Sequence, residues 1–82
     1  MDRLYIDVFI PGLNKSYDIT VAPDMNVREA AKYIFKTISE YEMLSLYDDS
    51  FILCDRNSKR ILSGSMTLEQ CKIQDGAKLI LV

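Results

Sequence analysis

The sequence contains no histidine, the residue that most often serves as a general base and as a metal ligand. A serine or cysteine nucleophile would therefore lack its usual partner. Cys54 and Cys71 are the two cysteines, and they are too far apart to form a CxxC pair. We interpret both as reduced, largely buried small side chains rather than as part of a zinc site or a disulfide scaffold. We expect no enzymatic activity, no metal and no cofactor.

Basic stripes and long apolar runs are also missing. Ten basic and twelve acidic side chains are spread along the chain and give a net charge of −2, so a nucleic-acid partner is not expected. The longest apolar runs, near 51–54 and 79–82, are far too short to span a bilayer. The first residues have no positive segment followed by an apolar stretch. We therefore expect a cytoplasmic protein without direct membrane insertion.

The residues that are present favour one compact fold. The chain has 82 residues, of which about half are apolar, which is enough for one thin core but not for two. The sequence predicts a single domain over residues 1–82 that folds on its own.

The first third has the pattern of a β-hairpin. Apolar and mixed side chains alternate along 4–10, so that one side of this segment is uniformly aliphatic. Residues 11–15 supply a proline, a glycine and an asparagine for a turn, and the alternation resumes along 17–21. Two antiparallel strands are predicted.

A helix is predicted to follow. Pro23 and Asp24 end the second strand, and Asn26 to Glu29 has the arrangement of a capping box. The apolar residues that follow recur at helical spacing on one stripe, which predicts a helix that covers one face of a sheet and ends within 39–42.

Shorter elements are expected in the second half. We predict a loop at 41–49 with space for one helical turn at 43–46, strands at 51–54 and 60–62, a helical turn at 67–71 capped by Thr67, and a last strand at 77–82. Leu79 and Leu81 are expected to point inward. The fold class is α+β, with ββαββ order and a short helical turn before the last strand. For these elements to share one core, the helix must lie across a mixed sheet of about five strands with the last strand beside the first, which is a β-grasp.

Particular segments resemble ubiquitin. Residues 15–27 are similar to its second strand and helix entry, with an alternating strand, a proline and a capped helix. Thr67-Leu68, Ile73-Gln74 and the segment 79–82 resemble its closing part in the same order. The resemblance covers nearly the whole chain and implies the ubiquitin-like fold; it says less about function.

A narrower resemblance concerns bacterial type VII secretion. The length, the aliphatic ending and the pattern Ile73-x-Asp75-Gly76-x-x-Leu79 are similar to the YukD/EsaB family of these systems. That resemblance implies a cytosolic accessory or regulatory component that binds the secretion machinery. One alternative is the ubiquitin-like domain of a larger membrane component of such a system. A protein modifier or sulfur carrier is less favoured, because the sequence ends at Val82 without the terminal Gly-Gly that those proteins use.

The candidate site is a protein-binding patch. Tyr5 and Phe9 have outward parity on the first strand, and Ile80 and Val82 have outward parity on the last. Because these strands are neighbours in a β-grasp, the four side chains are expected to form one apolar area on the open face of the sheet. We expect Leu13 and Ile52 to extend this area, although Phe51 could take the place of Ile52. The alternatives are scattered exposed side chains, or coverage by the loop at 41–49.

Overall fold

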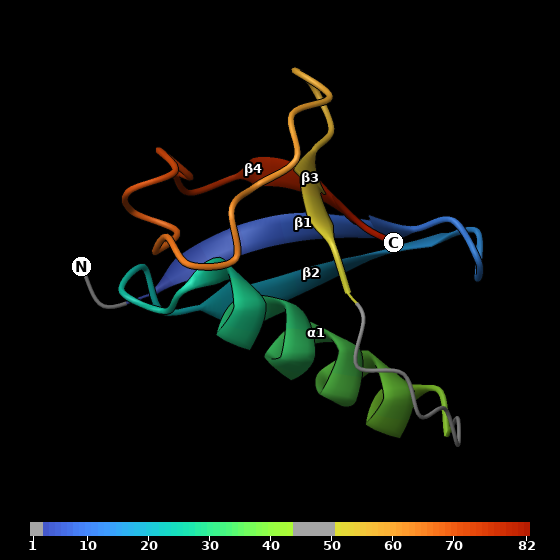
Figure 1. The fold of residues 1–82 in the computed structure, drawn as a ribbon. Coiled ribbons are helices and arrows are strands. Elements are labelled where there is room, and N and C mark those ends of the chain that lie inside the picture. Colours follow the sequence, from blue (N-terminus) through green and yellow to red (C-terminus); the bar gives the residue numbers. More distant parts are fainter. Residues whose placement is uncertain (1–2, 44–50) are drawn as a thin grey trace.

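The computed structural model describes residues 3–43 and 51–82, and its elements follow the predicted order (Figure 1). They are β1 (Leu4–Ile10), β2 (Lys15–Val21), α1 (Val27–Tyr41), β3 (Leu53–Asp55) and β4 (Ala77–Leu81). The described strands form a four-stranded sheet in the order β2-β1-β4-β3, and α1 crosses one face of it. β1 pairs antiparallel with β2 and in parallel with β4, and β3 pairs antiparallel with β4. The predicted β-grasp, with its last strand beside the first, is confirmed.

Strict alternation in β1 and β2 produces one buried face and one open face. Ile6 and Val8 point to one side of β1 and are buried, whereas Tyr5 points to the opposite side and is exposed. The hairpin turn ends at Asn14, whose φ of 54° lies in the left-handed region that asparagine tolerates better than most residues. Leu4 to Ile10 pair with Val21 to Lys15 without a bulge.

The helix begins where the sequence predicts. Asn26 Oδ1 accepts a hydrogen bond of 2.9 Å from the Glu29 N–H, which satisfies one free donor of the first turn. The Val27 and Arg28 N–H groups donate to the carbonyls of Met66 and Gly64, at 2.8 and 3.2 Å. α1 ends at Tyr41, within the predicted range.

The prediction of a strand at 60–62 is wrong. Ile61 forms a single isolated bridge with Cys54, so the described sheet has four strands instead of about five. The chain turns sharply before it, with Lys59 at a φ of 62°, and then makes two hydrogen bonds to β3, from Asp55 N–H to Arg60 O and from Leu62 N–H to Leu53 O. This contact is too short to form a ladder. β3 itself begins two residues later than the predicted 51–54 and ends one residue later.

In the turn before β4, the side chains of Thr67 and Gln70 each accept a hydrogen bond from the backbone N–H of the other residue. Thr67 Oγ1 accepts from the Gln70 N–H at 3.0 Å, and Gln70 Oε1 accepts from the Thr67 N–H at 2.9 Å. The Cys71 N–H closes one helical turn on Thr67 O, as predicted. Leu68 and Cys71 are buried beneath it.

The core lies between α1 and the sheet. It contains aliphatic residues from every strand and from the buried stripe of α1. Leu79 and Leu81 are buried, so the predicted inward parity of the last strand is confirmed. The predicted helical turn at 43–46 and most of the loop at 41–49 lie outside the described residues. In the described part of the chain, no helix is long and apolar enough to cross a membrane.

Candidate protein-binding surface

The face of the sheet opposite α1 carries a row of apolar side chains that crosses three strands. Residues paired across neighbouring strands point to the same side of a sheet. The pairs on the open side are Phe9 with Ile80, Cys54 with Ile80, and Cys54 with Ile61. The row therefore runs from β1 over β4 and β3 to the segment beside β3.

A second pair lies next to this row. Ile52 and Val82 exchange two backbone hydrogen bonds, of 3.1 and 2.9 Å, just beyond the paired ends of β3 and β4. Their parity is that of Cys54 and Ile80, so they share the open face. We call these six residues the open-face cluster: Phe9, Ile52, Cys54, Ile61, Ile80 and Val82. Three of its members are strongly exposed, Ile52 at 48%, Ile61 at 66% and Val82 at 65%.

The structure brings together four of the six residues that the sequence assigns to the patch, namely Phe9, Ile52, Ile80 and Val82. Tyr5 is on the same face and exposed, but the paired residues Asp7 and Lys78 lie between it and Phe9. Leu13 packs against the core and does not join the cluster.

The ambiguity between Phe51 and Ile52 is resolved by the helix. The Phe51 ring stacks on Phe35 of α1, with 4.2 Å between ring centroids and 28° between planes. Phe51 therefore lies on the core side, and Ile52 points outward.

Sequence reasoning missed Arg56, which borders the cluster. Its Nη2 is 3.3 Å from Asp7 Oδ1 and 3.1 Å from the carbonyl of Leu79, and its guanidinium carbon is 5.7 Å from the centroid of the Phe9 ring. The Arg56 side chain thus lies over β4 and places a cation beside an apolar surface. Arg56 has the same parity along the chain as Ile52 and Cys54. This alternation could have been used to predict that Arg56 lies on the open face.

Ile61 was also missed. Within the predicted segment 60–62 it alternates with Leu62, which is buried. Because neighbouring side chains of an extended segment point to opposite sides, an inward Leu62 predicts an outward Ile61. The exposure of Ile61 could therefore have been predicted from the sequence, even though the segment is not a strand.

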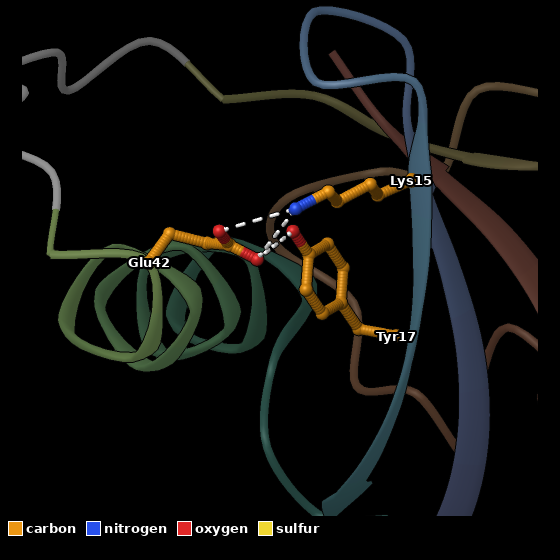
Figure 2. Close-up of polar contacts among 3 residues, drawn as sticks. All are labelled: Lys15, Tyr17 and Glu42. Carbon is orange, nitrogen blue, oxygen red and sulfur yellow. Dashed lines mark hydrogen bonds and ion pairs between the residues drawn. The ribbon is translucent and has the colours of Figure 1, made fainter.

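A separate polar cluster joins β2 to the end of α1 (Figure 2). Tyr17 Oη donates a 2.7 Å hydrogen bond to Glu42 Oε1, and Lys15 Nζ is 3.3 Å from Glu42 Oε2. Burial of the phenol and its hydrogen bond to Glu42 raise the pKa of Tyr17 to about 12. The same hydrogen bond holds the pKa of the Glu42 carboxyl below its usual range.

Within 3–43 and 51–82, no group of three or more histidine, cysteine or acidic side chains is placed to hold a metal ion. Both cysteines are free; Cys71 is buried, whereas Cys54 is half-buried within the open-face cluster, so its predicted burial is only partial.

Comparison of sequences finds no match, since neither a protein-family model nor a curated protein matches the chain. Solved structures match well. The EccD5 ubiquitin-like domain from Mycobacterium xenopi is similar over 100% of this chain and 94% of its own, at 10% identity and a TM-score of 0.78. The ubiquitin-like domain of the Mycobacterium tuberculosis type VII secretion system protein EccD1 matches over 100% and 99%, at 14% identity and a TM-score of 0.75.

A third match is part of a larger chain. A protein of the MycP5-free ESX-5 inner membrane complex contains a region similar to 100% of this chain, at 12% identity and a TM-score of 0.77. This chain covers 21% of that protein. The four-stranded mixed sheet, the crossing helix and these neighbours together show that the chain has the ubiquitin-like β-grasp fold, which it shares with ubiquitin-like domains of type VII secretion proteins.

Proposed function

We propose that this chain is a ubiquitin-like protein-interaction module that docks a partner on the open-face cluster. The contiguity of that cluster is the observation that carries the proposal. Apolar side chains from β1, β3, β4 and the segment beside β3 meet on one face, and three of them are strongly exposed. Burying them against a partner would remove apolar area from water at little cost in polar desolvation.

The border of the cluster favours a protein partner. Arg56, Asp7 and Lys78 form a charged band along one side of the cluster. An apolar centre with a polar rim is the usual anatomy of a protein interface, with most binding energy in the centre. The charges would contribute orientation more than affinity.

We further propose that the system is bacterial type VII secretion. Ubiquitin-like domains of EccD1 and EccD5 support this, because they share the fold over nearly their full length. The role proposed is that of a cytoplasmic accessory or regulatory component of the YukD/EsaB kind. The match to a region of a larger chain in an inner membrane complex favours a second candidate, a domain of such a membrane component.

Replacing Phe9 and Ile80 together by serine tests the docking surface. Both side chains are half-buried on the open face, and neither belongs to the buried core. We expect the double variant to keep its circular dichroism spectrum and to lose the partners that the wild-type chain captures from its native cytosol. Tyr33→Ser with Met66→Ser is the matched control, because both residues are 39% exposed and lie outside the cluster. A folded double variant that captures the same partners would contradict the proposal.

Site-specific crosslinking tests the system. A photoreactive amino acid at Ile52, which is exposed at the border of the cluster, should crosslink in cells to a component of the secretion machinery. The same amino acid at Tyr33 provides the control. Crosslinks from Ile52 to proteins unrelated to secretion would leave the docking surface in place and reject this system.

The docking proposed here is non-covalent. The intact masses of its partners, measured with and without the chain present in cells, should be the same. A mass increase equal to that of this chain would show conjugation instead.

A further inference from the structure

Four charged side chains form a row across the open face of the sheet, next to the open-face cluster. Asp7 on β1 is paired with Asp18 on β2 and with Lys78 on β4. The Arg56 N–H donates to the Lys78 carbonyl at 2.9 Å, which places Arg56 beside Lys78, just past the end of β3. Residues opposite one another on neighbouring strands point to the same face. We call these four residues, in the order Asp18, Asp7, Lys78 and Arg56 across the sheet, the charge row.

The order of charges in this row does not favour the isolated chain. Two anions lie on the half of the sheet that β2 and β1 form, and two cations lie on the other half. Like charges directly opposite one another destabilise a sheet, and each half contains such a pair. Arg56 reaches over β4 to Asp7 at 3.3 Å, but neither Asp18 nor Lys78 makes an ion pair within the residues that the structure describes. The row is complementary to a surface that carries the same charges in the reverse order.

The apolar cluster has the same centre as the charge row. Phe9 on β1 is paired with Ile80 on β4, and Asp7 is paired with Lys78 on the same two strands, two residues earlier. β1 and β4 are the two central strands of the sheet. The charged and the apolar row are therefore both centred on the line between β1 and β4.

We infer that a second copy of this chain stacks its open face on this one, about a two-fold axis that runs parallel to the strands between β1 and β4. This axis keeps each position along the strands and exchanges the two halves of the sheet. Asp7 of each copy then lies opposite Lys78 of the other copy, and Asp18 lies opposite Arg56. The inference deepens the proposed function and rests on it, because it names an occupant of the open-face cluster.

The charge row selects this axis over the other two-fold arrangement of two stacked sheets. An axis perpendicular to the strands would place each strand over itself, so the charge row would lie over itself, with Asp7 on Asp7, or over the apolar row. The parallel axis joins opposite charges at all four positions and brings Phe9 of each copy onto Ile80 of the other. Sheets packed face to face with their strands within about 30° of each other are common in proteins. A second copy has the reversed charge order by symmetry, whereas a foreign partner would have to carry it independently.

Self-association is expected to be weak and reversible. The charge row spans four strands, which is about 14 Å between the two outer strands. A face of this width lies at the small end of stable protein interfaces. The second copy therefore covers the open-face cluster at high protein concentration, and a component of the secretion machinery that binds more tightly displaces it.

Sedimentation equilibrium of the chain up to millimolar concentration tests the inference. Wild type should dimerise, and the Phe9→Ser/Ile80→Ser variant should stay monomeric. Asp7→Lys and Lys78→Glu should each weaken dimerisation by about fivefold or more, because two favourable charge pairs become repulsive. Asp24→Lys and Lys36→Glu change the charge in the same way at exposed positions outside the open face and should dimerise as wild type does. Circular dichroism checks the fold of each variant.

Mixing the two open-face variants checks the axis. An equimolar mixture of Asp7→Lys and Lys78→Glu should form a mixed dimer about as tight as that of wild type, because each lysine then lies opposite a carboxylate. Lys78 is exposed, so Lys78→Glu alone gives the charge test if Asp7→Lys does not fold. The inference is overturned if wild type is monomeric at millimolar concentration, if Lys78→Glu dimerises as wild type does, or if two folded variants associate no more tightly together than separately.

The same variants separate this inference from the proposed function. A monomeric wild type whose Phe9→Ser/Ile80→Ser variant still loses its cytosolic partners would reject the second copy and leave the docking surface in place. A wild type that dimerises with the expected charge dependence, while the double variant captures the same partners, would reject the docking of those partners and keep the second copy.

Discussion

Single side chains fix both ends of α1. At its start, Asn26 Oδ1 accepts from the Glu29 N–H at 2.9 Å. We expect Asn26→Ala to lower the free energy of unfolding by about 1 kcal/mol, because the first turn loses an acceptor for one of its free N–H groups. Urea denaturation measures the loss, and Asp24→Ala, two residues before the cap, is the control. Equal stability of Asn26→Ala and wild type would mean that the Met66 and Gly64 carbonyls alone hold this end of the helix.

At the other end of α1, Tyr17 and Glu42 form a hydrogen bond whose strength depends on pH. The pKa of Glu42 is lowered in the folded state, so its contribution is present above the ordinary value of about 4.5 and is lost as pH falls through the folded value. The pKa of Tyr17 is raised to about 12, so its contribution is present below about 10 and is lost as pH rises toward 12.

We therefore expect Tyr17→Phe to lower the melting temperature at neutral pH, with the difference from wild type shrinking below pH 4 and above pH 10. Thermal melts across this range measure it. Tyr33→Phe is the control because the Tyr33 hydroxyl makes no hydrogen bond within the described residues. A difference that stays constant with pH would show that Glu42 is not the partner that matters.

The roles of single residues are predictable only when their contacts are local. Asn26 acts on a residue three positions away, so its cap could be predicted from the sequence. The bond between Tyr17 and Glu42 spans 25 positions, and the pair of Arg56 with Asp7 spans 49. Such contacts depend on how the strands and the helix are placed, which side-chain alternation does not specify.

Among the elements, β4 lies in the centre of the sheet, between β1 and β3. Leu79 is 0% exposed and pairs with Val8 and Asp55 on its two sides. We expect Leu79→Ala to cost about 2 to 5 kcal/mol, because the cavity it leaves lies beneath α1 and cannot collapse fully. Lys78→Ala, one position away and exposed, should cost far less in the same urea denaturation. Equal costs at the two positions would contradict the inward parity of Leu79.

The turn that leads into β4 is held to the start of β1. Tyr5 N–H donates to Asp75 Oδ1 at 2.6 Å, and the Gly76 N–H donates to Tyr5 O at 2.7 Å. Gly76 has a φ of 84°, a backbone conformation that residues other than glycine rarely adopt. We expect Gly76→Ala to lower stability by about 1 to 2 kcal/mol through backbone strain. Gly12→Ala is the control: a new Cβ there meets nothing within 4 Å and φ is not positive, so its stability should match wild type or exceed it slightly.

Periodicity decided which elements could be predicted. β1, β2 and α1 are long enough for their patterns to repeat, and their positions and faces were predictable. The three-residue β3 has no such repeat, so the sequence does not decide whether Phe51 or Ile52 faces outward. The stack of Phe51 on Phe35, a contact distant in sequence, decides it. The segment 60–62 has the composition of a strand but is limited to one bridge by the turn before it.

At the scale of the whole molecule, the fold was predictable and the extent of the binding surface was not. The order of elements restricts one core to few arrangements, and the β-grasp is the one adopted. The open-face cluster instead depends on which residues lie opposite each other. Ile61 and Cys54 join it through a bridge, Tyr5 is separated from it by Asp7 and Lys78, and Leu13 is directed to the core.

The parallel pairing of β1 with β4 has a consequence for the order in which the chain is made. β4 lies between β1 and β3, so the centre of the sheet cannot close until residues 77–81 have left the ribosome. Until then the hairpin of β1 and β2 is an incomplete sheet with an open inner edge, the form most prone to mispairing with other nascent chains. Closing the long loop between β1 and β4 also costs more entropy than closing the hairpin. Folding is therefore expected to finish only once β4 has emerged, and factors that shield exposed strand edges would act on this protein before that point.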